Sequence, residues 1–152
     1  MGEPRLYASC RVDDLLVGID IEAVQEVTSG AELTPVPLAS PVVSGLLNLR
    51  GQIVTAIELR RCLQLADRPA GQRPFNVILK TADGCVSLLV DEVGDVLTVD
   101  ADDFEPPPET LRGRLKQLIA GAYKLDGQLL LALDIDGVLG VSSAGQQHVT
   151  GG

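Results

Sequence analysis

The chain has 152 residues and a mass of 16.0 kDa, enough for one domain with its own core. Its net charge is −9 and only 3% of its residues are aromatic, so it would repel nucleic acid and offers few rings for bases to stack on. The longest uncharged stretch, 33–49, is interrupted by prolines, and the N-terminus lacks the apolar core of a signal peptide. We expect a cytoplasmic protein that binds no nucleic acid and does not insert into a membrane.

Alternating apolar and polar residues mark strands along most of the chain, and a turn dipeptide such as Asp126-Gly127 joins the strands of each pair. Four hairpins are predicted: 6–12 with 15–21, 45–49 with 52–57, 75–81 with 85–93, and 117–125 with 128–133. Helices are expected to be few and short, at 22–25, 59–65, 111–116 and in a final turn capped by Asp134 or Asp136.

The predicted hairpins form an internal repeat. Residues 6–24 align with 75–93, and residues 45–59 align with 121–135, in the same order in both halves. The second alignment matches Gly45 with Gly121. The alternative is that any two hairpins look alike, but the shared order favours two similar units.

These units predict a mainly β fold. Frequent turns, 16 glycines and 9 prolines favour small closed sheets, so we expect two small β-barrels related by a pseudo-twofold axis. The first is expected to comprise mainly 5–65 and the second mainly 75–141, with strand exchange between them as an open possibility. The Pro- and Gly-rich segment 66–74 reads as a linker, and 142–152 reads as a disordered tail. Each half is marginal alone, so the two should share an apolar interface.

The sequence offers little catalytic chemistry. The three cysteines form no C-x-x-C pair, and the single histidine, His148, follows the last apolar segment. Cys10, Cys62 and Cys85 are expected to be reduced and mostly structural. A metal-dependent enzyme is the alternative of a different class, and it would use the acidic run of Asp100, Asp102 and Asp103. That run lacks the glycine a calcium loop requires, so we expect no enzyme, no metal and no cofactor.

Several segments together resemble the CheW family of bacterial chemotaxis proteins. They are LVGIDI (16–21), VQEV (24–27), TPVP (34–37), VSGLLNLRGQIV (43–54), LVDEV (89–93) and LALD (131–134). The resemblance extends from Arg5 to Val141 and identifies 5–141 as a single CheW-like domain. It implies two five-stranded, SH3-like barrels around a common core and no catalytic activity.

The resemblance also implies partners. CheW-like proteins are adaptors that bind the regulatory domain of the histidine kinase CheA and the cytoplasmic tip of chemoreceptors, also called methyl-accepting chemotaxis proteins. The protein would therefore be recruited to membrane-associated receptor arrays. A second hypothesis with the same fold is an adaptor of a non-flagellar chemosensory pathway.

Site residues follow from the matched motifs. Glu26 and Arg50 match two charges that are thought to interact in the family and to influence receptor and kinase coupling; a solvated turn charge is the alternative reading of Arg50. Further partner-binding candidates are Val24, Asn48 and Gly51, although Val24 could belong to the core and Gly51 could serve only the turn. Candidates at the seam between the barrels are Val90, Asp91 and Val93, for which a purely structural role is equally open.

Overall fold

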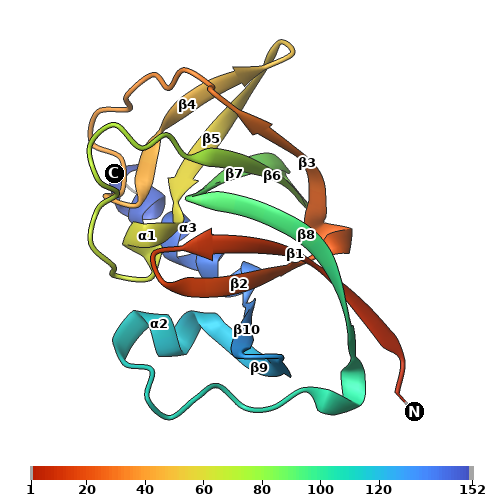
Figure 1. The fold of residues 1–152 in the computed structure, drawn as a ribbon. Helices are drawn as coiled ribbons and strands as arrows, with labels where there is room; N and C mark the ends of the chain where they lie inside the picture. Colours follow the sequence, from red (N-terminus) through yellow and green to blue (C-terminus); the bar gives the residue numbers. More distant parts are fainter. Residues whose placement is uncertain (1, 151–152) are drawn as a thin grey trace.

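The computed structural model describes residues 2–150, with side chains described as far as residue 142. Within this range, ten strands form two five-stranded sheets (Figure 1). The first sheet has the order β8-β1-β2-β10-β9, with β1 at Pro4–Val12, β2 at Leu15–Asp20, β8 at Glu92–Asp100, β9 at Ile119–Leu125 and β10 at Gln128–Leu133. The second sheet has the order β3-β6-β7-β5-β4, with β3 at Val24–Ser29, β4 at Val43–Leu49, β5 at Gln52–Glu58, β6 at Phe75–Thr81 and β7 at Gly84–Val90.

The two sheets are built on one plan, which confirms the mainly β prediction and the internal repeat. Each has an antiparallel hairpin at its centre, β1–β2 or β6–β7, and a parallel contact from that hairpin to β10 or β5. The outer strand beside each hairpin comes from the other half: β3 follows β2 along the chain but pairs with β6, and β8 follows β7 but pairs with β1. The sheets therefore divide the chain differently from the expected units 5–65 and 75–141. Exchanging a strand joins two halves that are each only marginally large enough to be stable alone.

The sheets do not close into barrels by pairing of their outer strands. In the second sheet, one bridge between Thr34 and Leu46 joins the segment after β3 to β4. In the first sheet, the bridge between Glu105 and Ala122 makes the same connection to β9. The expected closed barrels are thus two curved sheets, each completed by a segment without regular strand structure.

The repeated glycine of each half is explained by this completing segment. A Cβ atom at Gly45 would lie 2.7 Å from the Thr34 carbonyl oxygen, and one at Gly121 would lie 2.6 Å from the Glu105 carbonyl oxygen. Both distances are shorter than real Cβ contacts. The backbone therefore approaches so closely that only glycine fits.

Several boundaries differ from those predicted. The strand expected at 85–93 breaks at Asp91, where the chain leaves the second sheet and enters the first. A one-turn 3-10 helix, Ile21–Ala23, replaces the helix expected at 22–25, because β3 begins at Val24. The other helices are α1 at Leu59–Cys62, α2 at Gly113–Leu118 and α3 at Ile135–Thr150, and a second 3-10 turn lies at Ala101–Asp103.

Helix α3 is longer than the final turn that the sequence predicts. Asp134 caps it as expected, because its Oδ1 accepts a hydrogen bond from the Gly137 amide at 3.1 Å. The helix then runs through 142–150, which we expected to be disordered; residues 151–152 of that tail lie outside the described residues. Once a cap and the buried Val138 have fixed the first turn, each further residue adds a hydrogen bond without a new nucleation cost.

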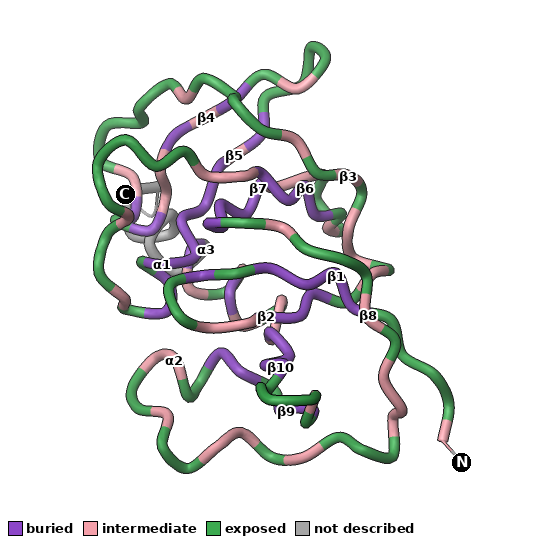
Figure 2. The backbone as a smooth tube through the Cα atoms, in the orientation of Figure 1, coloured by how far each residue is buried: buried purple, intermediate pink, exposed green. Residues whose placement is uncertain are grey.

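The largest apolar core is shared by the two sheets, as the marginal size of each half predicts, and each sheet also has a smaller cluster of its own (Figure 2). Val12 and Val17 of the first sheet and Ile57 and Leu88 of the second belong to the same buried cluster. Each such side chain contributes about 1.5–3 kcal/mol relative to exposure. The shared core holds the faces of the two sheets in a fixed relation to one another.

Candidate functional site

The turn between β4 and β5 presents Arg50 at the end of the second sheet. Arg50 has φ +51° and Gly51 has φ +89°, the left-handed pair that a tight hairpin turn requires. The Asn48 Oδ1 accepts a hydrogen bond from the Gly51 amide at 2.8 Å and fastens the turn. Asn48 and Gly51 therefore have a local role: they shape the turn that positions Arg50.

Arg50 reaches Glu26 on β3, so the predicted interaction of these two charges is confirmed. Its Nη1 donates to Glu26 Oε1 at 3.0 Å, and its Nη2 donates to Oε2. The hydrogen bonds from Arg50 are the main cause of a lowered pKa at Glu26, and those to Glu26 raise the pKa of Arg50. The Arg50 side chain remains 66% exposed and that of Glu26 26% exposed, so a partner has access to both.

The pair is absent from the other half of the repeat. Extension of the first alignment by two residues places Asp95 where the second sheet has Glu26, in agreement with the strand registers, and the second alignment places Asp126 where it has Arg50. Two acidic residues cannot form the same bidentate contact. The two ends of the pseudosymmetric fold thus differ in charge, which allows a partner to distinguish them.

The other predicted residues have mixed positions. Val24 is half-buried on β3 and packs against the main core. Val90 is fully buried in that core, and Val93 packs against it. The contacts of these three apolar side chains are with the core, which is a structural role.

Asp91 belongs to a buried ion cluster, and its surroundings could not be read from the sequence. Arg60 on α1 donates to Asp91 from Nε at 2.9 Å and from Nη2 at 2.6 Å. Arg68, in the linker, donates to Asp91 at 3.0 Å and bidentately to Glu58 at 2.8 and 2.9 Å. All four side chains are less than 10% exposed. The expected linker is therefore anchored through Arg68 and is not a free connector.

Asp91 also joins the two sheets directly. Its Oδ2 accepts a hydrogen bond from the amide of Asp13, in the β1–β2 turn of the first sheet, at 2.7 Å. Its other partners follow β5 of the second sheet. Although burial raises the pKa of Asp91, the hydrogen bonds from Arg60, the Asp13 amide and Arg68 lower it overall. The site forms only where the fold brings together residues 13, 60, 68 and 91, which are far apart along the chain. The spacing of these residues in the sequence does not indicate that they meet.

The acidic run that suggested metal chemistry is part of a turn. Asp100 caps the turn Ala101–Asp103, because its Oδ1 accepts from the Asp102 amide at 2.8 Å. Within the described part of the chain, no group of three or more His, Cys, Asp or Glu side chains is placed to hold a metal ion.

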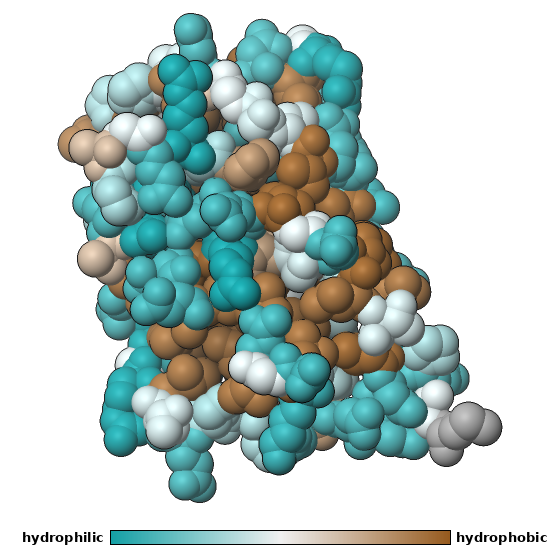
Figure 3. Space-filling view, viewed as in Figure 1, coloured by the Kyte–Doolittle hydropathy of each residue, from teal (hydrophilic) through white to brown (hydrophobic). Residues whose placement is uncertain are grey.

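Exposed apolar side chains occur on strands of both sheets. Ile53, next to the Arg50 turn on β5, is 65% exposed. Val27 on β3, Val96 on β8 and Leu6 on β1 are also exposed. Figure 3 shows apolar surface gathered in the middle of the face on which β8 runs between the two hairpins. Apolar surface of this kind is typical of protein-interaction faces.

Comparison with known proteins agrees with this architecture. The family model described as CheW-like domain matches residues 7–142, nearly the whole chain. The chain belongs to the CheW family. The chemotaxis protein CheW of Treponema pallidum is 31% identical over 79% of this chain and 73% of its own length. The CheW of Rhizobium meliloti is 28% identical over 84% of this chain and 83% of its own.

A solved structure confirms the fold. The crystal structure of scaffolding protein TtCheW from Thermoanaerobacter tengcongensis superimposes with a TM-score of 0.76 and 26% identity, covering 86% of this chain and 89% of that one. The two curved sheets are accordingly the SH3-like subdomains of the CheW fold. No helix among the described residues of this CheW-family chain is long and apolar enough to cross a membrane.

Proposed function

We propose that this protein is a non-catalytic adaptor that couples chemoreceptors to the histidine kinase CheA in chemotaxis signalling. The observation that carries the proposal is the match of the CheW-like family model to residues 7–142. Relatives with more than 70% of their own length aligned are named chemotaxis protein CheW, and the matched crystal structure is titled a scaffolding protein. The protein acts in the cytoplasm, at receptor arrays to which its partners recruit it.

The shape of the molecule suits a coupling role. An adaptor must hold two partners in a fixed relation, and two sheets packed on one core supply two faces on a rigid body. The buried cluster around Asp91 adds polar links between these sheets. The proposal needs no reactive group, and we assign none.

The Glu26–Arg50 pair is our candidate for a coupling contact. Arg50 is exposed, lies at the tip of a hairpin and has Ile53 exposed beside it. Arginine next to an exposed apolar side chain is a common composition for interface hot spots. Because the other half has Asp95 and Asp126 at the equivalent positions, a partner that requires this arginine binds one end of the molecule only.

We place Val24, Asn48 and Gly51 in supporting roles. Asn48 and Gly51 set the Arg50 turn, and Val24 anchors β3, on which Glu26 lies. Val90, Asp91 and Val93 act at the seam by fixing the relation of the sheets. A partner touches the exposed strands around the seam, since Val90 and Asp91 are themselves buried.

Calorimetric titration with the isolated regulatory domain of the CheA encoded nearest to this protein tests the proposal. We expect saturable one-to-one binding in the micromolar range or tighter. Addition of receptor signalling fragments in vesicles should then stimulate or inhibit the kinase only when the adaptor is present. Absence of binding to every CheA of the organism, with both proteins folded, would refute the coupling role. Binding only to the CheA of a gene cluster without flagellar genes would establish the non-flagellar alternative.

A further inference from the structure

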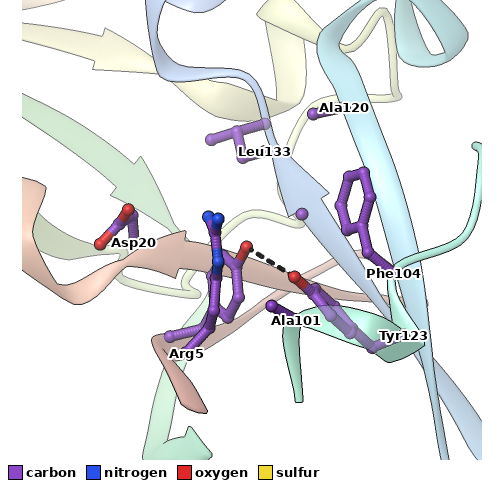
Figure 4. Close-up of a pocket in the computed structure, with 9 residues that line it drawn as sticks. Arg5, Asp20, Ala101, Phe104, Ala120, Tyr123 and Leu133 are labelled. Carbon is purple, nitrogen blue, oxygen red and sulfur yellow. Dashed lines mark hydrogen bonds between the residues drawn. The ribbon is translucent and has the colours of Figure 1, made fainter. Parts of the chain in front are cut away.

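Three of the four aromatic residues of the chain converge on one cavity. The sequence contains two tyrosines, two phenylalanines and no tryptophan. The ring centroids of Tyr7 and Tyr123 are 5.4 Å apart, and those of Phe104 and Tyr123 are 5.3 Å apart (Figure 4). Phe104 is nevertheless 45% exposed. A core would bury such a ring, so its exposure beside a cavity indicates a surface available to a ligand.

The cavity has a volume of about 280 Å³, at the small end of ligand sites. Its apolar lining comes from Phe104, Tyr123 and several small or aliphatic side chains: Ala101, Ala120, Ala132 and Leu133. Its polar lining comes from Arg5, Asp20 and the hydroxyls of Tyr7 and Tyr123. Figure 4 shows the Arg5 guanidinium beside the bonded hydroxyls, with Asp20 on one side and Phe104 on the other.

The polar groups of the cavity retain unused hydrogen-bonding capacity. The two tyrosine hydroxyls lie 3.2 Å apart and share one hydrogen bond, which leaves one hydroxyl hydrogen free to donate. Burial, followed by the contact with Tyr7, raises the pKa of Tyr123 to about 12, so its hydroxyl stays protonated at neutral pH. Among residues 2–142, no carboxylate oxygen lies within 4.0 Å of the Arg5 guanidinium. A carboxylate in the cavity would meet both donors.

Asp20 supplies the opposite charge. Its Oδ1 accepts from the Glu22 amide at 3.0 Å, and the carboxylate has a second oxygen for another donor. The cavity thus combines a cation, an anion, a hydroxyl donor and an aromatic wall. We propose that this cavity binds a small zwitterion with an apolar side chain, namely an apolar or aromatic α-amino acid. Its carboxylate would meet Arg5 and a tyrosine hydroxyl, its ammonium group Asp20, and its side chain the ring of Phe104.

The other half of the repeat provides an internal comparison. An equivalent cavity of about 320 Å³ is lined by residues that include Leu33, Asn76 and Leu89. The repeat places Asn76 where the first half has Tyr7, and Leu89 where it has Asp20. That cavity has its own charged residues, Arg73 and Glu32, but it lacks the tyrosine hydroxyl pair and the aromatic wall. An amino acid whose side chain packs on a ring and whose carboxylate accepts from a tyrosine hydroxyl should therefore prefer the first half.

Amide chemical-shift titration of the full chain with L-phenylalanine and L-leucine tests this proposal without any signalling partner, so its outcome is independent of the proposed function. We expect saturable shifts around β1, β9 and residues 101–104, and none around Asn76, with a Kd of about 0.1–1 mM for so small a ligand. 3-Phenylpropionate, without the ammonium group, and phenethylamine, without the carboxylate, should each bind at least about tenfold more weakly than L-phenylalanine.

Variants distinguish a built site from general surface binding. Arg5→Gln should weaken binding about tenfold or more, because a charged hydrogen bond is lost. Tyr7→Phe should weaken it by a smaller factor. Arg11→Gln is the matched control, since Arg11 lies on the same strand and its exposed guanidinium bonds to Gln128 at 3.1 Å. The proposal is wrong if 10 mM amino acid causes no localised shifts, if both halves respond alike, or if Arg5→Gln binds as tightly as Arg11→Gln.

Discussion

Glu26 and Arg50 link the two open edges of the second sheet. Glu26 lies on β3 at one edge, and Arg50 follows β4 at the other, with Arg50 Nη1 donating to Glu26 Oε1 at 3.0 Å. The contact is exposed, and exposed ion pairs contribute little to stability because solvent screens them. Its position at the end of the molecule therefore points to recognition more than to folding.

Substitution of Arg50 should separate assembly from stability. Arg50→Gly removes the charge and relieves a positive φ, so the variant should melt within a few degrees of the wild type or above it. Arg50→Glu should also stay folded but repel Glu26. Both should weaken ternary assembly with receptor and CheA about tenfold or more in sedimentation assays. A large fall in melting temperature for Arg50→Gly would show that the arginine is structural and would remove it from the site.

Loss of Asp91 should be severe. Asp91→Ala removes the carboxylate that the buried guanidinium groups of Arg60 and Arg68 contact. The free energy of unfolding should fall by about 3–5 kcal/mol, which is a large part of the stability of a domain this size. Glu22→Ala is the matched control, because the repeat aligns Glu22 with Asp91, and it should change stability by less than about 0.5 kcal/mol. Urea unfolding measures both. Equal effects of the two substitutions on the free energy of unfolding would mean that the buried ion cluster does not stabilise the fold.

The same carboxylate predicts a dependence of stability on pH. The folded pKa of Asp91 lies below its unfolded value, so the ionised carboxylate stabilises the fold above about pH 4, and this contribution is lost as pH falls through the folded pKa. The free energy of unfolding should therefore decline in acid more steeply for the wild type than for Asp91→Asn. Parallel curves for the two proteins between about pH 5 and 2 would contradict the assigned shift.

Close backbone approach predicts the effect of adding one methyl group. Gly121→Ala would place a Cβ 2.2 Å from Phe104 Cζ and 2.6 Å from the Glu105 carbonyl oxygen, so it should destabilise the fold by about 1–3 kcal/mol. Gly140→Ala is the control: it lies in α3 with no heavy atom within 4 Å of the added carbon, and it should stabilise the protein by up to about 1 kcal/mol. Thermal melts compare them, and an unaffected Gly121→Ala would argue against the close contact.

The cysteines should differ in reactivity. Burial raises the pKa of Cys10 and of Cys62 to about 12, and both side chains are 1% exposed. Cys85 is only half-buried. A thiol reagent at neutral pH should therefore label one site per folded chain, and Cys85→Ser should abolish the fast reaction. Rapid labelling of Cys10 or Cys62 in the native protein would show that the core opens readily.

The sequence by itself determined the elements that depend on neighbouring residues. Period-two alternation and turn dipeptides located the hairpins, and the alignment of 6–24 with 75–93 revealed the repeat that the sheets follow. The turn at Arg50 and Gly51 was also located from the sequence, because a glycine between two apolar strands marks a hairpin turn with positive φ. The family, and with it the pairing of Arg50 with Glu26, also followed from motifs in the sequence.

The tertiary structure decided what depends on long-range contacts. The exchange of β3 and β8 between sheets is invisible to local pattern, because a strand reads the same whichever hairpin it joins. The break between β7 and β8 at Asp91 was missed because it depends on long-range contacts: the Asp91 carboxylate is held by Arg60, Arg68 and the Asp13 amide. The convergence of Tyr7, Phe104 and Tyr123 is of the same kind. Segments far apart along the chain meet only when both sheets pack on the shared core, and the spacing of residues in the sequence does not indicate this packing.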